Sequence, residues 1–438
     1  MAEETIAMVN ARSGMEKIVE SQEPVTRSVS LMHSVGQRLS LDERAVNELV
    51  SPQEVVIFRI PSKTLGKVVI HWGCMALHNN ARGPYKGGVR ISEDVTAWET
   101  IELARLMTLK TAANDVEFGG GKTGIRIDFP SMYRLFGKKP RDSEFERILK
   151  LDAVEYFAHA FKDIFSSHKY VPAPDVGTGG EEMAVIFNQT NDPASVTGKP
   201  SGIHGWLPGR EEATGWGCFE ASRVAARELL HKDIGECTAA VQGFGNVGRW
   251  TARYLQQHGA KVLAVTDSRG GAYDAHGLDI PSLIERKERS GAVSGFAAEI
   301  DNQRLFKLDL DILVPAALGD AITAANAPGI KAKSVVEGAN MPVSLDGMEV
   351  LNEKKIAVVP DIIANAGGVI GSMEEYSRSL SAIKVDKSQV LGIISEKITT
   401  SFRESLDLMS SEGITLSEAA VQIAMQRVYD AMQHRSFI

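Results

Sequence analysis

The sequence predicts an α/β protein that contains more than one domain. Its 438 residues are enough for two or three domains of ordinary size. Short β-rich runs alternate with helical segments over residues 238–360, and this alternation predicts a parallel sheet with helices on both faces. Earlier in the chain, β-rich runs at residues 53–60 and 67–74 predict a hairpin. A loop rich in proline and glycine at residues 192–213 lies between these regions and predicts a domain boundary.

Composition and charge exclude several broad classes of protein. Apolar residues make up 43% of the chain and charged residues 24%, as in an ordinary soluble globular protein. The net charge of −8 argues against a nucleic-acid partner, which would normally meet a basic face. No segment has the roughly 18 apolar residues of a membrane helix, and the N-terminus lacks a signal or transit peptide pattern. Cys74, Cys218 and Cys237 are few and far apart, which indicates packing residues in a reducing compartment. We therefore expect a cytoplasmic protein without a membrane, nucleic-acid or metal partner.

The first part of the chain is predicted to surround its hairpin with helices. Residues 1–50, 96–114, 143–168 and 181–191 carry apolar residues in helical spacing. His71 lies in the second β-rich run. A lone histidine on a strand is more often a packed or surface residue than a ligand, and we interpret His71 in this way.

Three lysines within residues 83–122 occupy settings that are unusual for lysine. Lys86 stands in a Gly-Pro-Tyr-Lys-Gly-Gly turn. Lys110 follows apolar residues three and four positions earlier, so its stem lies on the apolar face of the predicted helix. Lys122 ends a triple-glycine loop that precedes a short predicted strand. Desolvation beside such a loop favours the neutral amine, which is the form that can act as a base. Three solvated surface lysines are the alternative.

A carboxylate is held in a stiff loop further along the chain. Two prolines in YVPAPDVGTGG exclude a helix and place Asp175 just before a glycine-rich turn. From this stretch alone, a functional carboxylate and an ordinary surface aspartate are equally good interpretations.

Residues 238–267 contain the clearest local motif. A short buried strand leads into Gly243-Phe244-Gly245-Asn246-Val247-Gly248, and a helix and a second strand follow. The second strand ends at Asp267, about 20 positions after the last glycine, as the dinucleotide fingerprint requires. The glycines allow a tight turn and close packing, and the free N–H groups of the helix N-terminus face the pyrophosphate. The motif predicts that the protein binds NAD or NADP.

The motifs KGGVR, LARLMTLKTAA, GGGKTGI, PAPDVGTGG, EEATGWG, GFGNVG, VVEGAN and NAGGVIGS follow one another from about residue 50 to the end. In sequence and order they resemble the glutamate/leucine/phenylalanine/valine dehydrogenase family. The resemblance implies an α/β fold with a mixed-sheet substrate-binding and oligomerisation domain at residues 1–200. A Rossmann-like dinucleotide-binding domain at residues 201–370 follows it. C-terminal helices at residues 371–438 would then pack back on the first domain.

The resemblance also implies a reaction, the reversible oxidative deamination of an amino acid to its 2-oxo acid and ammonia with NAD or NADP. Lys122 would activate the attacking water, Asp175 would transfer protons, and Lys110 would pair with the substrate α-carboxylate. Substrate choice would depend on the positions of Lys86 and Ser372. Glutamate enzymes of the family have a lysine and a serine at these positions, and both side chains reach the side-chain carboxylate of the substrate.

The remaining implied roles concern the cofactor and the assembly. Val369 would complete the substrate pocket. The cofactor would be held by Thr214, Gly243, Gly245, Asn246, Val247, Gly248, Asp267, Ser268, Asn340 and Asn365. Asp267 favours the ribose of NAD, whereas Arg269 could meet the 2′-phosphate of NADP, so the choice of cofactor stays open. A homo-hexamer is the expected assembly.

Two alternatives remain on the sequence alone. The GGGKT around Lys122 is shared with branched-chain enzymes of the family, so a branched-chain or aromatic amino-acid dehydrogenase is one alternative. A catalytically silent regulatory subunit of the same fold is the other. The sequence also departs from the family at Glu181 and Glu182, which could alter domain closure or subunit contacts, and at Gly371, which could loosen the substrate pocket.

Overall fold

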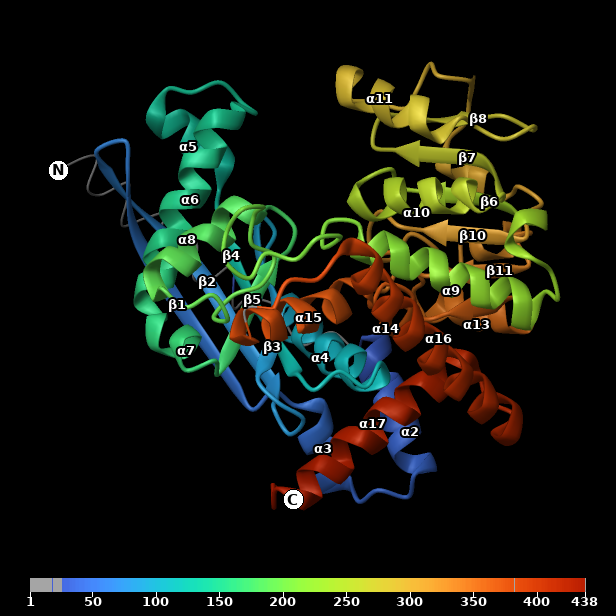
Figure 1. Ribbon diagram of the computed structural model, residues 1–438, viewed down its shortest axis with the longest axis horizontal. Helices are drawn as coiled ribbons and strands as arrows, with labels where there is room; N and C mark the ends of the chain where they lie inside the picture. Colours follow the sequence, from blue (N-terminus) through green and yellow to red (C-terminus); the bar gives the residue numbers. More distant parts are fainter. Residues whose placement is uncertain (1–17, 19–25, 382, 438) are drawn as a thin grey trace.

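The chain folds around two β-sheets that lie apart in the molecule (Figure 1). The computed structural model describes residue 18, residues 26–381 and residues 383–437. Within these residues, one sheet has the strand order β1-β2-β4-β3-β5, and the other has the order β12-β11-β10-β6-β7-β8-β9. The predicted α/β class with two units is confirmed.

The first sheet is mixed, as predicted. Strands β1 (Glu54–Thr64) and β2 (Lys67–Asn79) form the expected antiparallel hairpin. Strand β4 (Gly119–Arg126) pairs antiparallel with β2 and parallel with β3 (Tyr85–Ser92). Strand β5 (Tyr170–Pro174) pairs parallel with β3 and completes the sheet.

Helix α4 packs against β2 and β4, whereas α6 packs against β1 and α8. The predicted helix over residues 143–168 is interrupted at Phe161, which links α6 to the short α7. The helices of this part of the chain are α4 (Ala97–Ala113), α5 (Phe129–Phe136), α6 (Ser143–Ala160), α7 (Lys162–Ser166) and α8 (Gly180–Thr190).

Two glycine-rich stretches that were predicted as a turn and a loop are strands. Lys86 lies on β3, and the triple glycine before Lys122 belongs to β4. A Cβ atom at Gly120 would lie 2.2 Å from Thr108 Oγ1 and 2.3 Å from the carbonyl oxygen of Ala104, both on α4. Glycine is needed here so that the helix can lie directly on the strand. The prediction was wrong because a glycine run signals close backbone approach as well as a turn.

The second sheet is parallel except at one edge. Strand β8 (Gly270–Tyr273) pairs antiparallel with β7, because the chain turns back directly after β7 without a helical crossover. Strand β9 (Ala298–Glu299) pairs antiparallel with β8. The parallel strands are β6 (Thr238–Gln242), β7 (Lys261–Asp267), β10 (Ile312–Pro315), β11 (Ser334–Val336) and β12 (Ala357–Val359). The associated helices are α9 (Ala213–Leu229), α10 (Asn246–Gln257), α11 (Ile280–Ser290), α12 (Asn302–Phe306) and α13 (Leu345–Glu353), with 3₁₀ turns at Ile234–Glu236 and Ala327–Gly329.

Helices from both ends of the chain join the two units. Helix α17 packs on α4 and α2, and α16 packs on α17 and α9 (Figure 1). The two long C-terminal helices expected from the sequence are confirmed. The helices predicted within residues 1–50 are described from residue 27 onward, and residues 1–17 and 19–25 lie outside the described residues. These connecting helices are α2 (Arg27–Arg38), α3 (Glu43–Val50), α14 (Asp361–Ala364), α15 (Gly367–Ser381), α16 (Lys387–Glu412) and α17 (Leu416–His434).

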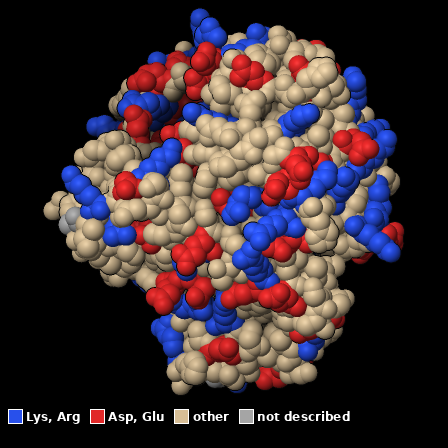
Figure 2. Space-filling model, turned by 45° about the vertical axis from the view of Figure 1, so that its right-hand side comes forward, with Lys and Arg blue, Asp and Glu red and all other residues tan. Residues whose placement is uncertain are grey.

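Charged side chains of both signs are interspersed over the face shown in Figure 2. Within the described part of the chain, no helix has the length and apolar character needed to cross a membrane. Cys74, Cys218 and Cys237 are buried free thiols, as expected of packing residues. Burial lowers the pKa of His71 to about 4, so it is a neutral packed histidine.

The contact between α4 and β4 yields the first prediction. Gly120→Ala would force α4 away from β4, so we expect unfolding to become easier by about 3 kcal/mol or more, the upper end for overpacked sites. The control is Gly392→Ala on α16, where a Cβ atom would meet nothing within 4 Å. Thermal and denaturant unfolding of both variants measures the difference. Equal stability of the two variants would contradict the role given to Gly120.

Candidate active site

A cavity of about 760 Å³ opens between the two sheets and is lined by both parts of the chain. Strands β3 and β4 and helix α4 form one wall, and the loops after β10 and β11 face them. The predicted site residues that line it are Lys86, Lys110, Lys122, Asp175, Thr214, Val247, Asn340, Asn365, Val369 and Ser372. The other predicted residues lie beyond it, where β6 leads into α10 and at the end of β7: Gly243, Gly245, Asn246, Gly248, Asp267 and Ser268.

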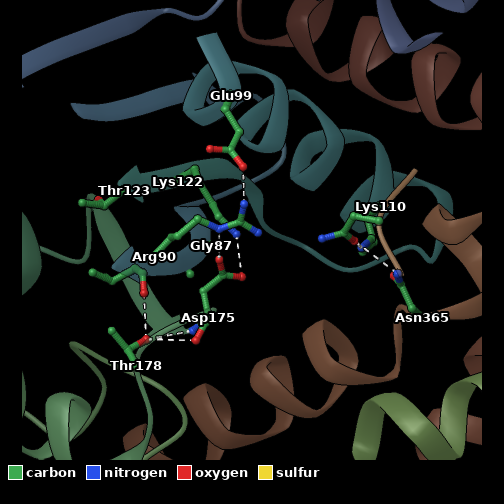
Figure 3. A network of polar contacts seen from close by, with 12 residues as sticks. Gly87, Arg90, Glu99, Lys110, Lys122, Thr123, Asp175, Thr178 and Asn365 are labelled. Atoms are coloured by element: carbon green, nitrogen blue, oxygen red, sulfur yellow. Dashed lines mark hydrogen bonds and ion pairs between the residues drawn. The ribbon is translucent and has the colours of Figure 1, made fainter. Parts of the chain in front are cut away.

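Asp175 lies at the centre of a largely buried ion-pair network (Figure 3). Its Oδ1 accepts a hydrogen bond from Lys122 Nζ at 2.8 Å, and its Oδ2 accepts one from Arg90 Nε at 2.9 Å. Arg90 also pairs with Glu99 in the first turn of α4. The backbone N–H of Asp175 donates to Thr178 Oγ1 at 2.9 Å. The carboxylate therefore has a fixed orientation, as a proton-transfer group requires.

The charges around Asp175 keep it ionised. Burial alone would raise the pKa of this carboxyl, but the attraction of Lys122 and Arg90 outweighs burial and lowers it to about 2. Loss of a proton from the Lys122 ammonium would remove the largest of these attractions. The carboxylate would then become a better proton acceptor, so the pair is suited to a proton relay.

Lys110 reaches across the cavity to the second unit. Its Nζ donates to Asn340 Oδ1 at 3.0 Å, and Asn365 Nδ2 donates to the same oxygen at 3.2 Å. Burial lowers the pKa of Lys110. At the end of α4, the side chain of Asn114 donates to the carbonyl oxygen of Ile362 at 2.7 Å, which ties this helix to α14. Figure 3 shows Lys110 and Asn365 facing each other from the two sides.

Two cations of the cavity, Lys86 and Arg210, have no side-chain hydrogen bond to any described residue. Lys86 is only 1% exposed, and burial together with the charge of Arg210 lowers its pKa well below the ordinary value. Burial also lowers the pKa of Arg210, whose Nε makes no hydrogen bond. Ser372 and Val369 on α15 line the same cavity. This arrangement offers hydrogen-bond donors without a partner to an anion, whose charge would in turn favour the protonated form of Lys86.

A second buried pair supports this region from behind. Lys199 Nζ lies 2.9 Å from Glu375 Oε1, and both side chains are fully buried. Glu375 also accepts backbone hydrogen bonds from Gly198 at 2.7 Å and from Lys199 at 3.1 Å. Glu375 lies one turn after Ser372 on α15, so the pair fixes this helix against the loop between the two units.

The glycine-rich turn after β6 has the geometry of a pyrophosphate cradle. Gly243 has a φ of +94°, which favours glycine. A Cβ atom at Gly248 would lie 1.8 Å from the carbonyl oxygen of Gly243, so α10 can pack this closely only without a side chain there. Helix α10 begins at Asn246 after the N-cap Gly245, and its free N–H groups suit an anion. The turn fits the pyrophosphate of NAD or NADP.

Asp267 ends β7, where the ribose of a dinucleotide is expected, but both of its oxygens already have partners. Lys287 Nζ lies 2.6 Å from Oδ2, and the backbone N–H groups of Val293 and Arg269 donate to Oδ2 and Oδ1 at 3.0 and 2.8 Å. The side chain of Arg269 donates instead to the carbonyl oxygen of Ser290 at 3.3 Å. Lys287 thus compensates the charge of Asp267, the carboxylate that the fingerprint places at the ribose of a dinucleotide.

Of the family departures, Glu181 and Glu182 lie away from the cavity, whereas Gly371 lies beside Arg210, which lines it. Glu181 pairs with Arg147 on the surface, and Glu182 accepts the backbone N–H of Gly179 at 2.7 Å at the start of α8. At Gly371 a methyl group would make ordinary contacts, the nearest at 3.4 Å, so free space remains beside Arg210. No cluster of His, Cys, Asp or Glu suited to a metal ion occurs among the described residues.

Sequence reasoning missed Arg90, Arg210 and Lys287. Arg90 could have been found, because strand residues at positions i and i+4 share a face, and Arg90 lies four residues after Lys86 on β3. The other two carry no local signal. Arg210 lies in the loop before α9, and Lys287 meets Asp267 only through the fold.

This fold and site define a class of protein, a dehydrogenase that binds a dinucleotide on one sheet and an anionic substrate on the other. Comparison with protein families then identifies the member of this class. The family model described as "Glutamate/Leucine/Phenylalanine/Valine dehydrogenase" matches residues 205–436. The model described as "Glu/Leu/Phe/Val dehydrogenase, dimerisation domain" matches residues 52–192. The chain belongs to the glutamate/leucine/phenylalanine/valine dehydrogenase family.

Curated relatives cover nearly the whole chain. It is 38% identical to the glutamate dehydrogenase of Thermotoga maritima, with 93% of this chain and 97% of the relative aligned. It is 34% identical to the NADP-specific glutamate dehydrogenase of Saccharolobus shibatae, with 97% of this chain and 99% of the relative aligned. It is also 34% identical to an NAD-specific glutamate dehydrogenase of Bacillus subtilis, with 93% of this chain and 95% of the relative aligned. The solved structure of a hetero-hexameric glutamate dehydrogenase of Thermus thermophilus superposes on this chain with a TM-score of 0.84 at 27% sequence identity. The superposition covers 95% of this chain and 99% of the Thermus chain. The chain is an NAD(P)-dependent amino-acid dehydrogenase, as predicted.

The pKa of Asp175 yields the second prediction. Because it is lower in the folded protein than the ordinary carboxyl value, the ionised carboxylate stabilises the fold above about pH 4, by about 2–3 kcal/mol. This stabilisation is lost as the pH falls toward about 2. We expect Asp175→Asn to lower the thermal midpoint by a constant amount from about pH 5 to 7 and by less and less below about pH 4. A midpoint difference that stayed constant down to about pH 2 would contradict the assigned ion pairs.

Proposed function

We propose that this chain catalyses the reversible NAD(P)-dependent oxidative deamination of L-glutamate to 2-oxoglutarate and ammonia. The observation that carries the proposal is the pair of unpartnered cations, Lys86 and Arg210, in the cavity that also holds Lys110, Lys122 and Asp175. A substrate with two carboxylates can satisfy cations at both ends of this cavity. The names of the curated relatives support the same substrate.

The residues of the cavity support the following division of labour. Lys110 pairs with the α-carboxylate, while Lys86 and Arg210 meet the side-chain carboxylate. Asp175 takes a proton from the substrate amino group. NAD or NADP, held at the glycine-rich turn after β6, would supply the acceptor for the hydride that leaves Cα. Lys122 in its neutral form then removes a proton from the water that attacks the resulting imine carbon. Asp175 returns its proton to the nitrogen, and ammonia leaves as the 2-oxo acid forms.

Position and charge suit these roles. Lys122 and Asp175 are already in hydrogen-bond contact, so a proton can pass between water, lysine, carboxylate and amine without large movement. Arg90 holds the other carboxylate oxygen and keeps Asp175 aimed at the lysine. Thr214, Asn340 and Asn365 line the cavity together with Val247 of the cofactor turn, and they are suited to orient the nicotinamide.

The alternatives fit the cavity less well. An aliphatic or aromatic side chain would leave Lys86 and Arg210 desolvated without a partner, which is unfavourable for buried charge. A catalytically silent subunit would need no Lys122–Asp175 relay, yet the chain keeps this pair and its Arg90 support.

A homo-hexamer is the assembly we propose. Strand β1 is an edge strand, and Val55, Ile57 and Val68 of the hairpin are 36–62% exposed. An exposed apolar edge strand requires covering, and a second copy of the same chain supplies a matching edge. The family model for this part of the chain is named for dimerisation, and the Thermus thermophilus relative is a hexamer.

Turnover by a lysine variant is the third prediction. Lys122→Ala should bind cofactor but lose about 10²–10⁴-fold in turnover, the usual range for a general acid–base group. Lys162→Ala, at an exposed lysine on α7, is the control. Glutamate, leucine, valine and phenylalanine are each assayed with NAD and with NADP. Parental turnover in the Lys122→Ala protein would refute the role of this lysine.

Specificity is the fourth prediction. A site built to pair a polar group rejects the analogue that lacks it by up to about 10⁴-fold. The parent should therefore prefer glutamate strongly over leucine in kcat/KM. The double variant Lys86→Leu and Ser372→Val removes this pairing and should shift the ratio toward leucine. A parent that used leucine as well as glutamate would favour the branched-chain alternative.

A further inference from the structure

Arg27 joins helix α2 to the loop that carries Asn340, although it lines no part of the cavity described above. Its Nη1 lies 2.6 Å from Glu337 Oε1, and its Nη2 donates to Glu337 Oε2 at 3.3 Å. Nη1 also donates to the carbonyl oxygen of Val343 at 3.0 Å. The side chain of Arg27 is 10% exposed and that of Glu337 is fully buried. One guanidinium therefore clamps both ends of the segment 337–343.

The middle of this segment has a further anchor. The backbone N–H of Asp361 donates to Glu337 Oε2 at 2.9 Å, and Asp361 Oδ2 accepts the backbone N–H of Met341 at 2.9 Å. Asn340 lies between these anchors, with its side chain turned toward Lys110. The loop is thus fixed on the side remote from the cavity, and this leaves the amide of Asn340 free to face it.

The clamp is also electrostatic. Burial raises the pKa of Glu337, while Arg27 opposes this effect. Asp361 adds a second carboxylate next to Glu337, and Arg27 attracts both. Without the guanidinium, two carboxylates would share a buried site at the base of the loop. Such a site would push them apart or force one to take up a proton.

We propose that Arg27 is a positioning residue for the dehydrogenase reaction, which holds the segment 337–343 so that Asn340 meets Lys110 beside the nicotinamide. This inference rests on the proposed function and on the role proposed there for Asn340. Arg27 touches neither substrate nor cofactor, so it acts only through the loop.

Kinetics of the full-length Arg27→Met enzyme test the proposal. Misplacement of Asn340 should lower kcat/KM for the cofactor by about tenfold or more, with KM for glutamate changed less than about threefold. Arg27→Lys keeps one contact to Glu337 and should restore part of the loss. The matched control is Arg38→Met on the same helix, where Arg38 pairs with Glu418 at the surface. This control should retain parental kinetics.

A double variant separates positioning from general stability. In Arg27→Met combined with Glu337→Gln, no carboxylate at position 337 is left unpaired, so the thermal midpoint should recover while kcat/KM for the cofactor stays low. Recovery of both, or parental kinetics in Arg27→Met alone, would overturn the inference. If Arg27→Met does not fold, Arg27→Lys and the double variant carry the test. A parent without glutamate oxidation would instead refute the proposed function itself.

Discussion

The close approach of helix α4 to strand β4 is the constraint on which the rest of the site depends. Helix and strand can touch only because glycine occupies the contact, where a Cβ atom at Gly120 would overlap the helix backbone. Lys110 leaves the helix and Lys122 leaves the strand, so this contact sets the distance between them. A Cβ atom at Gly87 on β3 would lie 1.6 Å from the carbonyl oxygen of Gly121, so the strand that carries Lys86 is packed equally closely. Small residues thus bring three long cationic side chains to one cavity.

Positive charge concentrated in this way is unfavourable until an anion arrives. Lys122 is compensated by Asp175, but Lys86 and Arg210 face the cavity without a hydrogen-bonded partner among the described residues. Desolvated cations without partners raise the free energy of the empty site, and in the proposed function the side-chain carboxylate of the substrate removes this penalty. Substrate binding and charge compensation are therefore one event. The positive charges of Lys122 and Arg90 likewise explain why the carboxylate of Asp175 stays ionised.

Most of what could be predicted came from the spacing of apolar and turn-forming residues over short stretches of the sequence. The hairpin, the strand–turn–helix of the dinucleotide motif and the long C-terminal helices follow from periodicity and turn residues, and the family resemblance gave the site residues. The domain boundaries at residues 200 and 370 and the individual site roles remain predictions. The failures have a common cause. Glycine runs at Gly87 and Gly120 signal either a turn or a close contact, and only the packed helix decides between them. Arg27, Arg210 and Lys287 act across long stretches of sequence, so no local pattern marks them.

The glycine that hinted at a branched-chain enzyme has a packing explanation. A Cβ atom at Gly121 would lie 3.0 Å from the ring of Tyr170 and 3.1 Å from Cβ of Tyr85, in the interior of the first sheet. Gly121 does not line the cavity. The glycine before Lys122 is thus explained by the close packing of Tyr170, and it gives no information about the substrate side chain. Lys86, Arg210 and Ser372 line the part of the cavity that we propose for the substrate side chain, and they carry hydrogen-bonding groups where an aliphatic substrate would need an apolar wall.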